Sequence, residues 1–136
     1  MLRYLLDTNL CIRVIRDRPA GLRSRFNAEA PGLCLSSVVL YELLCGAEQS
    51  SRPAETRQQV EQFTSRLTLL PFNDEAAAHG ADIRASLERR GETIGPYDLM
   101  IAGHARSRGL IVVTDNLGEF QRIDGLRSED WLHEPA

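Results

Sequence analysis

Two apolar runs, one near each end of the chain, stop abruptly at an aspartate. Leu2–Leu6 is interrupted only by Arg3 and leads into Asp7, and Leu110–Thr114 leads into Asp115. Short, nearly continuous apolar runs are typical of strands that are buried on both faces of a parallel sheet. In such sheets ligands bind outside the carboxyl ends of the strands. The pattern therefore predicts an α/β fold with both aspartates on the edge of the sheet where a ligand would bind. An aspartate after a strand is also a common helix cap, so each acid taken singly has this second interpretation.

Helical segments separate the expected strands, which also include Leu33–Ser36 and Leu67–Phe72. Caps, prolines and glycines set the expected helix bounds. Thr8 is expected to cap a helix that ends near Arg16, and the later helices are expected at about 20–28, 37–45, 53–66, 74–90 and 97–108. Ser36 or Ser37 and Asn73 or Asp74 are the other expected N-caps. This alternation predicts a short parallel sheet with helices on both faces, in a single domain over residues 1–136.

The basic residues are all arginines: 16 of them, with no lysine. A nucleotide-binding P-loop needs its lysine and a Schiff base needs an amine, so both kinds of chemistry are excluded. The net charge of −3 argues against a chain coated in positive charge, although a local basic patch can coexist with an acidic remainder.

Cysteine usage and hydropathy bear on the compartment. Cys11, Cys34 and Cys45 show no CxxC spacing and leave one thiol unpaired in any disulfide scheme, which favours a reducing compartment over a secreted scaffold or zinc site. No apolar run is long enough to span a membrane, and Asp7 interrupts the first apolar stretch too early for a signal peptide. A cytoplasmic protein is therefore expected.

Two further acids stand in unusual places. Glu42 lies within the apolar stretch Val38–Cys45, so its carboxylate is expected to pair with an arginine or to bind a metal. Asp98 lies in the first turn of the helix expected at 97–108, where a carboxylate also favours the helix dipole. Small residues later in that helix predict close packing against the sheet, which would hold Asp98 at the sheet edge.

Four acids that converge on one cleft raise one another's pKa values and need a compensating cation. All-oxygen ligands suit Mg²⁺ or Mn²⁺, and such ions promote the hydrolysis of phosphodiester bonds. Short polar residues beside the acids are expected to support them or to hold water: Thr8, Asn9, Thr114 and Asn116.

Four ordered motifs carry a resemblance: "LLDTN", "YELLCGAE", "PYDLMIAGHARSRGL" and "VTDNLGEF". Together they resemble the PIN domain and are most similar to the VapC ribonuclease toxins of bacterial toxin–antitoxin pairs. The resemblance implies a PIN-like fold and a Mg²⁺- or Mn²⁺-dependent endoribonuclease. It also implies a homodimer, a VapB-type antitoxin and a larger complex with that antitoxin and operator DNA.

Within this resemblance, Asp7 and Asp98 match the principal metal ligands of the family, and Glu42 matches its helical acid. Asp115 matches a fourth acidic position, with Thr114 as the hydroxyl residue beside it. Glu119 is another nearby acid, which leaves open which of the two completes the site. The Asp98 motif is similar to that of members that cut initiator tRNA in its anticodon stem-loop, so tRNA is the implied substrate.

Two other functions compete with a metal-dependent nuclease. A phosphotransfer domain would need a second acid where Asn9 stands, and also a lysine, so this class is disfavoured. A catalytically silent module that binds RNA or protein is the alternative, but the presence of all four acids counts against it.

Several features leave two interpretations open. Arginines near helix ends can offset the helix dipole or contact RNA phosphates: Arg84, Arg89, Arg90, Arg106 and Arg108. The helix at 53–66 can pack on the core or present a groove to an antitoxin helix. His79, His104 and His133 lack metal-binding spacing, and a packing role is expected for His104.

Overall fold

Five strands form one parallel sheet in this computed structural model, which describes residues 1–132. The strand order is β3-β2-β1-β4-β5. The strands are β1 (Tyr4–Leu6), β2 (Leu33–Ser36), β3 (Thr68–Leu70), β4 (Ile111–Val113) and β5 (Ser128–Glu129). The four predicted strands are confirmed: β2 has the predicted bounds, and the other three are shorter than predicted. The two-residue edge strand β5 was not predicted, and His133 lies outside the described residues.

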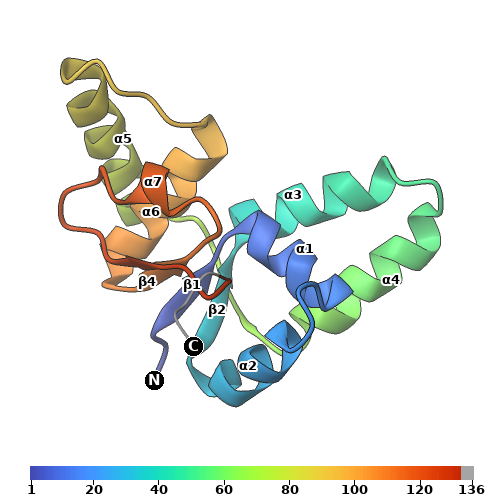
Figure 1. Cartoon of the computed structure of the whole chain (residues 1–136). Coiled ribbons are helices and arrows are strands. Elements are labelled where there is room, and N and C mark those ends of the chain that lie inside the picture. Colours follow the sequence, from blue (N-terminus) through green and yellow to red (C-terminus); the bar gives the residue numbers. More distant parts are fainter. Residues whose placement is uncertain (133–136) are drawn as a thin grey trace.

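Helices cover both faces of the sheet, as predicted. They are α1 (Thr8–Arg16), α2 (Leu22–Glu29), α3 (Ser37–Glu48), α4 (Pro53–Thr64), α5 (Asp74–Arg89), α6 (Pro96–Arg108) and α7 (Leu117–Phe120), with a short 3₁₀ turn, η1, at Ala30–Gly32. The first four helices lie on one side of the sheet and α5, α6 and α7 on the other (Figure 1). None of the helices in the described range is both long enough and apolar enough to cross a membrane.

The cap of α1 differs from the prediction. Asp7, rather than Thr8, is the N-cap, because its Oδ1 accepts a hydrogen bond from the backbone N–H of Leu10 at 2.9 Å. The helix therefore starts one residue earlier than the sequence indicated. At the other two helix starts, where the sequence left two candidate N-caps each, the caps are Ser36 and Asn73. Their side chains accept hydrogen bonds from backbone N–H groups at 3.1 and 3.0 Å.

The order of the strands places Asp7 at a special point of the sheet. β1 lies between β2 and β4, with Leu6 paired with Val113 in register. From β1 the chain continues to helices on one face, whereas β4 is reached from and followed by helices on the other face (Figure 1). The crevice beyond the carboxyl ends of two such strands is where open α/β sheets bind ligands. Asp7 follows β1 there, and Thr114 follows β4.

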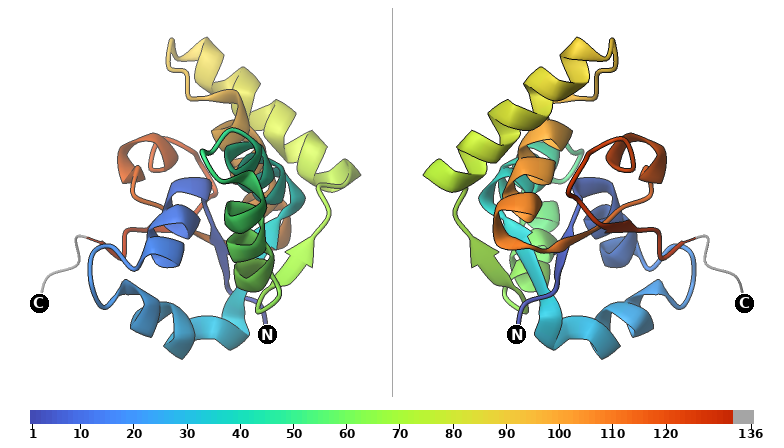
Figure 2. Two further views of the ribbon diagram at one scale, coloured as in Figure 1. Left: turned by 90° about the vertical axis from the view of Figure 1, so that its right-hand side faces the viewer. Right: turned by 90° about the vertical axis from the view of Figure 1, so that its left-hand side faces the viewer.

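Small residues bring α5 and α6 into close contact. A Cβ atom added to Gly103 would lie 2.5 Å from the backbone nitrogen of Gly80, which is too close for any side chain. α5 lies across α6 in both side views (Figure 2). The predicted close packing is thus present. At Gly103, however, the partner is α5 rather than the sheet, while Ala102 and Ala105 are buried in the core.

Candidate active site

Asp7 is almost completely buried, with 4% of its surface exposed. Its Oδ1 accepts from the Leu10 backbone, and its Oδ2 accepts from the hydroxyl of Thr114. Burial raises the pKa of Asp7 to about 6, and the neighbouring charges of Asp115 and Glu42 add to this rise. The two hydrogen bonds act against it by favouring the charged form. The position of this carboxylate is therefore fixed, but its negative charge lacks compensation.

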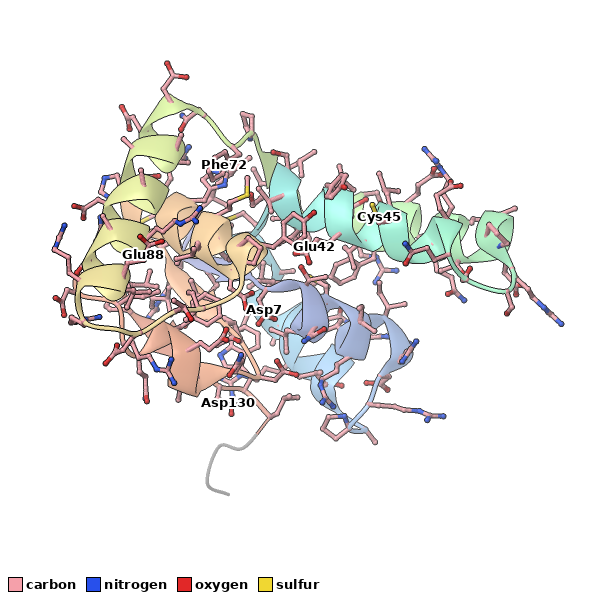
Figure 3. All side chains as sticks on the ribbon, turned by 90° about the horizontal axis from the view of Figure 1, so that it is seen from above. Asp7, Glu42, Cys45, Phe72, Glu88 and Asp130 are labelled. Carbon is pink, nitrogen blue, oxygen red and sulfur yellow. The ribbon has the colours of Figure 1, made fainter. Side chains whose placement is uncertain are left out.

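Glu42 reaches the same place from α3. Its Oε1 accepts a hydrogen bond of 2.6 Å from the hydroxyl of Thr8, which follows Asp7 in the chain. Seen from above, Asp7 lies near the centre of the molecule, with Glu42 beside it (Figure 3). No arginine within residues 1–132 forms an ion pair with Glu42. The sequence allowed an arginine partner or a metal ion for Glu42, and the described structure excludes the arginine partner.

Asp98 is half-buried in the first turn of α6, close to Glu119 of α7. Burial raises the pKa of Asp98 to about 7; the hydrogen bond with Glu119 contributes next, followed by the charges of Glu119, Asp7 and Glu42. The Oε2 atom of Glu119 is buried and has no hydrogen-bond partner among the residues described. These two carboxyl groups are therefore held together most easily when they share a proton or when a cation joins them.

Asp115 is placed differently from the other acids. Its Oδ2 accepts a hydrogen bond of 3.1 Å from Nε of Arg13, on α1. It is still near enough to raise the pKa of Asp7. Glu119 thus lies beside Asp98, whereas Asp115 is paired with a cation. Arg13 was not singled out in the sequence, because its partner is 102 positions away in the chain.

Three of the four predicted acids, Asp7, Glu42 and Asp98, line a pocket of about 210 Å³ at the carboxyl edge of the sheet, whereas Asp115 lines a neighbouring cavity. The walls of the pocket are Asp7, Thr8, Asn9, Glu42, Gly95, Pro96, Tyr97 and Asp98. The described residues contain no group of three or more His, Cys, Asp or Glu side chains already arranged to hold an ion. Mg²⁺ keeps several of its waters and takes only one or two carboxylates, so such an ion does not require a closed protein cage.

The residues present fit a hydrated divalent cation. Asp7 and Asp98 have raised pKa values, and an oxygen of Glu119 is buried without a partner. Each of these unfavourable features is relieved by positive charge in the pocket.

The four polar residues predicted to support the acids have different positions. Thr8 and Thr114 donate directly to Glu42 and Asp7. The backbone N–H of Asn116 donates to the Thr114 hydroxyl at 2.8 Å, which fixes that oxygen in turn. Asn9 is exposed at the wall of the pocket. Hydroxyl donors thus orient two of the acids before any ligand binds.

His104 has the packing role expected from the sequence. It is 1% exposed, its Nδ1 lies 2.8 Å from the Ser36 hydroxyl, and its ring meets the edge of Phe72. Burial lowers its pKa. The imidazole is therefore a neutral group of the core and does not line the acidic pocket.

Comparison with known proteins supports the geometry. Residues 4–126 match the PIN domain family. The chain is 52% identical over 131 residues to the tRNA(fMet)-specific endonuclease VapC of Shigella flexneri, covering 96% of this chain and 99% of the relative.

Two solved structures are also similar to the chain over nearly its whole length. One is DNA-bound VapBC of Salmonella typhimurium, with a TM-score of 0.92 and 53% identity over 96% of this chain and 99% of that one. The other is VapBC2 of Rickettsia felis bound to a promoter DNA fragment, with a TM-score of 0.89, 32% identity and the same coverage.

Proposed function

The chain belongs to the PIN domain family and, within it, to the VapC ribonucleases, and we propose that it cleaves initiator tRNA with Mg²⁺ or Mn²⁺ bound at its acidic pocket. The observation that carries the proposal is the meeting of Asp7, Glu42 and Asp98 at one pocket. These acids come from three separate elements, and no ion pair within the described chain neutralises them. The choice of tRNA is supported by the printed function of relatives that are about half identical to this chain.

Asp7 and Asp98 would hold the ion, with Glu42 beside them. A bound divalent cation supplies an activated water and stabilises negative charge on the phosphate. The protein contributes orientation: the Leu10 N–H and the Thr114 hydroxyl fix Asp7, and the Thr8 hydroxyl fixes Glu42. Because the pKa of Asp98 is raised, its ligand form would compete with protonation, so metal binding should strengthen as pH rises.

The proposed partner is a VapB-type antitoxin. The similar solved structures from Salmonella typhimurium and Rickettsia felis are both VapBC structures and both contain DNA, which supports an antitoxin partner and a DNA-bound complex for this chain. A homodimer stays a prediction from the family resemblance.

The test is incubation of the purified chain with total bacterial tRNA in Mg²⁺, Mn²⁺ or EDTA. We expect discrete fragments that require the metal, and their new ends should map to the initiator tRNA. Asp98→Asn should abolish these fragments. The matched control is Asp74→Asn, which changes an exposed acid in the first turn of α5, just as Asp98 lies in the first turn of α6.

Stability separates a lost site from a lost fold. Asp98→Asn removes a carboxyl whose pKa is raised by burial and by its neighbours. The unfolding temperature of this variant in EDTA should therefore equal or exceed that of the wild type. Undiminished cleavage by Asp98→Asn would refute the proposed site. A folded, antitoxin-free chain that binds tRNA but never cuts it would instead support the silent binding module.

A further inference from the structure

A second cavity adjoins the acidic pocket and carries the opposite charge. It has a volume of about 460 Å³ and is lined by Asn9, Ile12, Arg13, Arg16, Arg18 and Asp115. We call it the arginine groove. Asn9 lines both cavities, and the charge of Asp115 reaches Asp7. The groove is therefore continuous with the proposed site of cleavage.

Two of the three arginines in this groove have side chains with no protein partner among the residues that the structure describes. In the described part of the chain, the side chains of Arg16 and Arg18 form no ion pair or hydrogen bond with protein groups. Arg13 uses its Nε for Asp115, and its two Nη groups have no protein acceptor within residues 1–132.

Several arginines elsewhere are engaged by acids on the protein. Arg84 pairs with Glu88 at 2.8 Å, and Arg106 pairs with Asp82 at 2.7 Å. These contacts favour a structural role for two of the helix-end arginines that the sequence left open. What distinguishes the arginine groove is its grouping: Arg16 and Arg18 line one cavity with Arg13, and that cavity adjoins the acidic pocket.

The backbone holds the three arginines together. α1 ends at Arg16, and Asp17 adopts a left-handed conformation with φ of 51°. This turn returns the chain, so that the backbone N–H of Arg18 donates to the carbonyl of Arg13 at 3.0 Å. The carboxylate of Asp17 accepts a hydrogen bond of 3.0 Å from the backbone N–H of Arg23 and does not line the groove. The cations are therefore grouped by a defined helix end.

We propose that the arginine groove binds the phosphate backbone of the RNA strand next to the bond that is cut. The proposal deepens, and rests on, the function proposed above. Guanidinium groups match phosphate oxygens in geometry and contact them without reading bases. Asp115 holds Arg13 by its Nε and leaves its Nη groups to face the strand. An RNA strand approaching the acids of the pocket would be repelled without nearby positive charge, and the groove supplies that charge beside the pocket.

The experiment measures the binding of fluorescently labelled initiator tRNA in EDTA, where cleavage is prevented, across a range of NaCl concentrations. The variant is Arg16→Gln with Arg18→Gln. The matched control is Arg66→Gln with Arg122→Gln, which removes the same charge from exposed arginines outside both cavities. Arg66 lies two residues beyond the end of α4 just as Arg18 lies two residues beyond the end of α1, so the change beside a helix end is similar.

We expect the groove variant to lower the slope of log Kd against log salt by about 0.7 for each arginine removed. At low salt its Kd should rise by roughly tenfold, whereas the control keeps the wild-type slope. An unchanged slope in the groove variant, or an equal loss in the control, would overturn the proposal. A loss confined to binding of the cognate antitoxin would assign the groove to protein and would overturn it equally.

Cleavage by the wild type in Mg²⁺ keeps the two proposals apart. If the wild type cuts tRNA but the groove variant binds like the wild type, only the arginine groove fails. If the wild type binds through the groove but never cuts, the groove stands and the nuclease assignment fails.

Discussion

The two ends of α1 carry opposite charges and differ in how firmly those charges are held. At its start, Asp7 is buried and receives hydrogen bonds from Leu10 and Thr114. At its end, Arg16 and Arg18 are exposed, and their side chains have no bonded partner within the described residues. Both placements suit the helix dipole, so each also stabilises the helix. The difference shows that one short helix can present a rigid acid for chemistry and adaptable cations for holding a strand.

The largest effect should follow from changing the acidic end. Asp7→Asn should reduce cleavage about a hundredfold or more, because it removes a charge that acts at the reacting phosphate. The folded state should not suffer in EDTA, since Asn also caps helices well and avoids burying a charge. Asp7→Ala should lose cleavage equally but unfold about 1 kcal/mol more easily than Asp7→Asn, because it has no cap. Cleavage rates and denaturant melts check this. Equal stability of the two variants would show that the cap contributes nothing.

The next effect is a pH dependence that comes from the buried acids and not from the arginines at the other end of α1. The pKa of Asp7 is raised from 3.8 to about 6, and that of Asp98 to about 7. Between pH 4 and 7 these two carboxyl groups therefore bind more protons in the folded than in the unfolded state, so their contribution to the free energy of unfolding in EDTA should fall as pH rises. For Asp7 the rise in pKa corresponds to about 3 kcal/mol.

Subtracting two pH profiles isolates this contribution. The wild type should lose stability relative to Asp7→Asn between pH 4 and 7, whereas Arg16→Gln with Arg18→Gln should follow the wild type. Urea unfolding at each pH measures the difference, and the subtraction cancels Asp82, whose pKa Arg106 lowers. Parallel profiles for wild type and Asp7→Asn would contradict the burial of an uncompensated charge.

The smallest effect concerns the contact between the two regions, the pair of Arg13 and Asp115. Asp115→Asn should release Arg13 and tighten binding of tRNA in EDTA a few-fold at low salt. A double-mutant cycle with Arg13→Gln separates this release from the simple loss of a negative charge. If Asp115→Asn gives the same gain in the Arg13→Gln background, the pair does not control the arginine.

Much of the frame was predictable because its signals are local. The strand-ending acids, the helix end at Gly109 and the pairs of candidate caps that include Ser36 and Asn73 each depend on a few adjacent residues. Asp7 illustrates the limit of that reasoning. Its place after a strand was recognised, but Thr8 was predicted as the cap of α1, and in the structure Asp7 is the cap. A hydroxyl residue and an acid in sequence are both good caps, and only the backbone decides between them.

The contacts within the site were beyond the sequence for a different reason. Thr8 donates to Glu42 across 34 positions, and Arg13 meets Asp115 across 102. Such pairs depend on rotamers and on the exact arrangement of the helices, which no spacing rule contains. β5 was missed because its two residues, Ser128 and Glu129, are polar and lie at the sheet edge, where no apolar run marks a strand.

The backbone contact between Gly103 and Gly80 has a consequence for judging whether a gene of this family is still active. α6 begins two residues before Asp98, and the same helix meets α5 at Gly103. A valine at Gly103 would push the two helices apart and carry the start of α6 with it, because no side chain fits the gap. Such an allele would retain every acidic residue of the site in its sequence, yet the displaced α6 would leave the encoded protein inactive. Inventories of toxin genes that count only the acids would record it as functional.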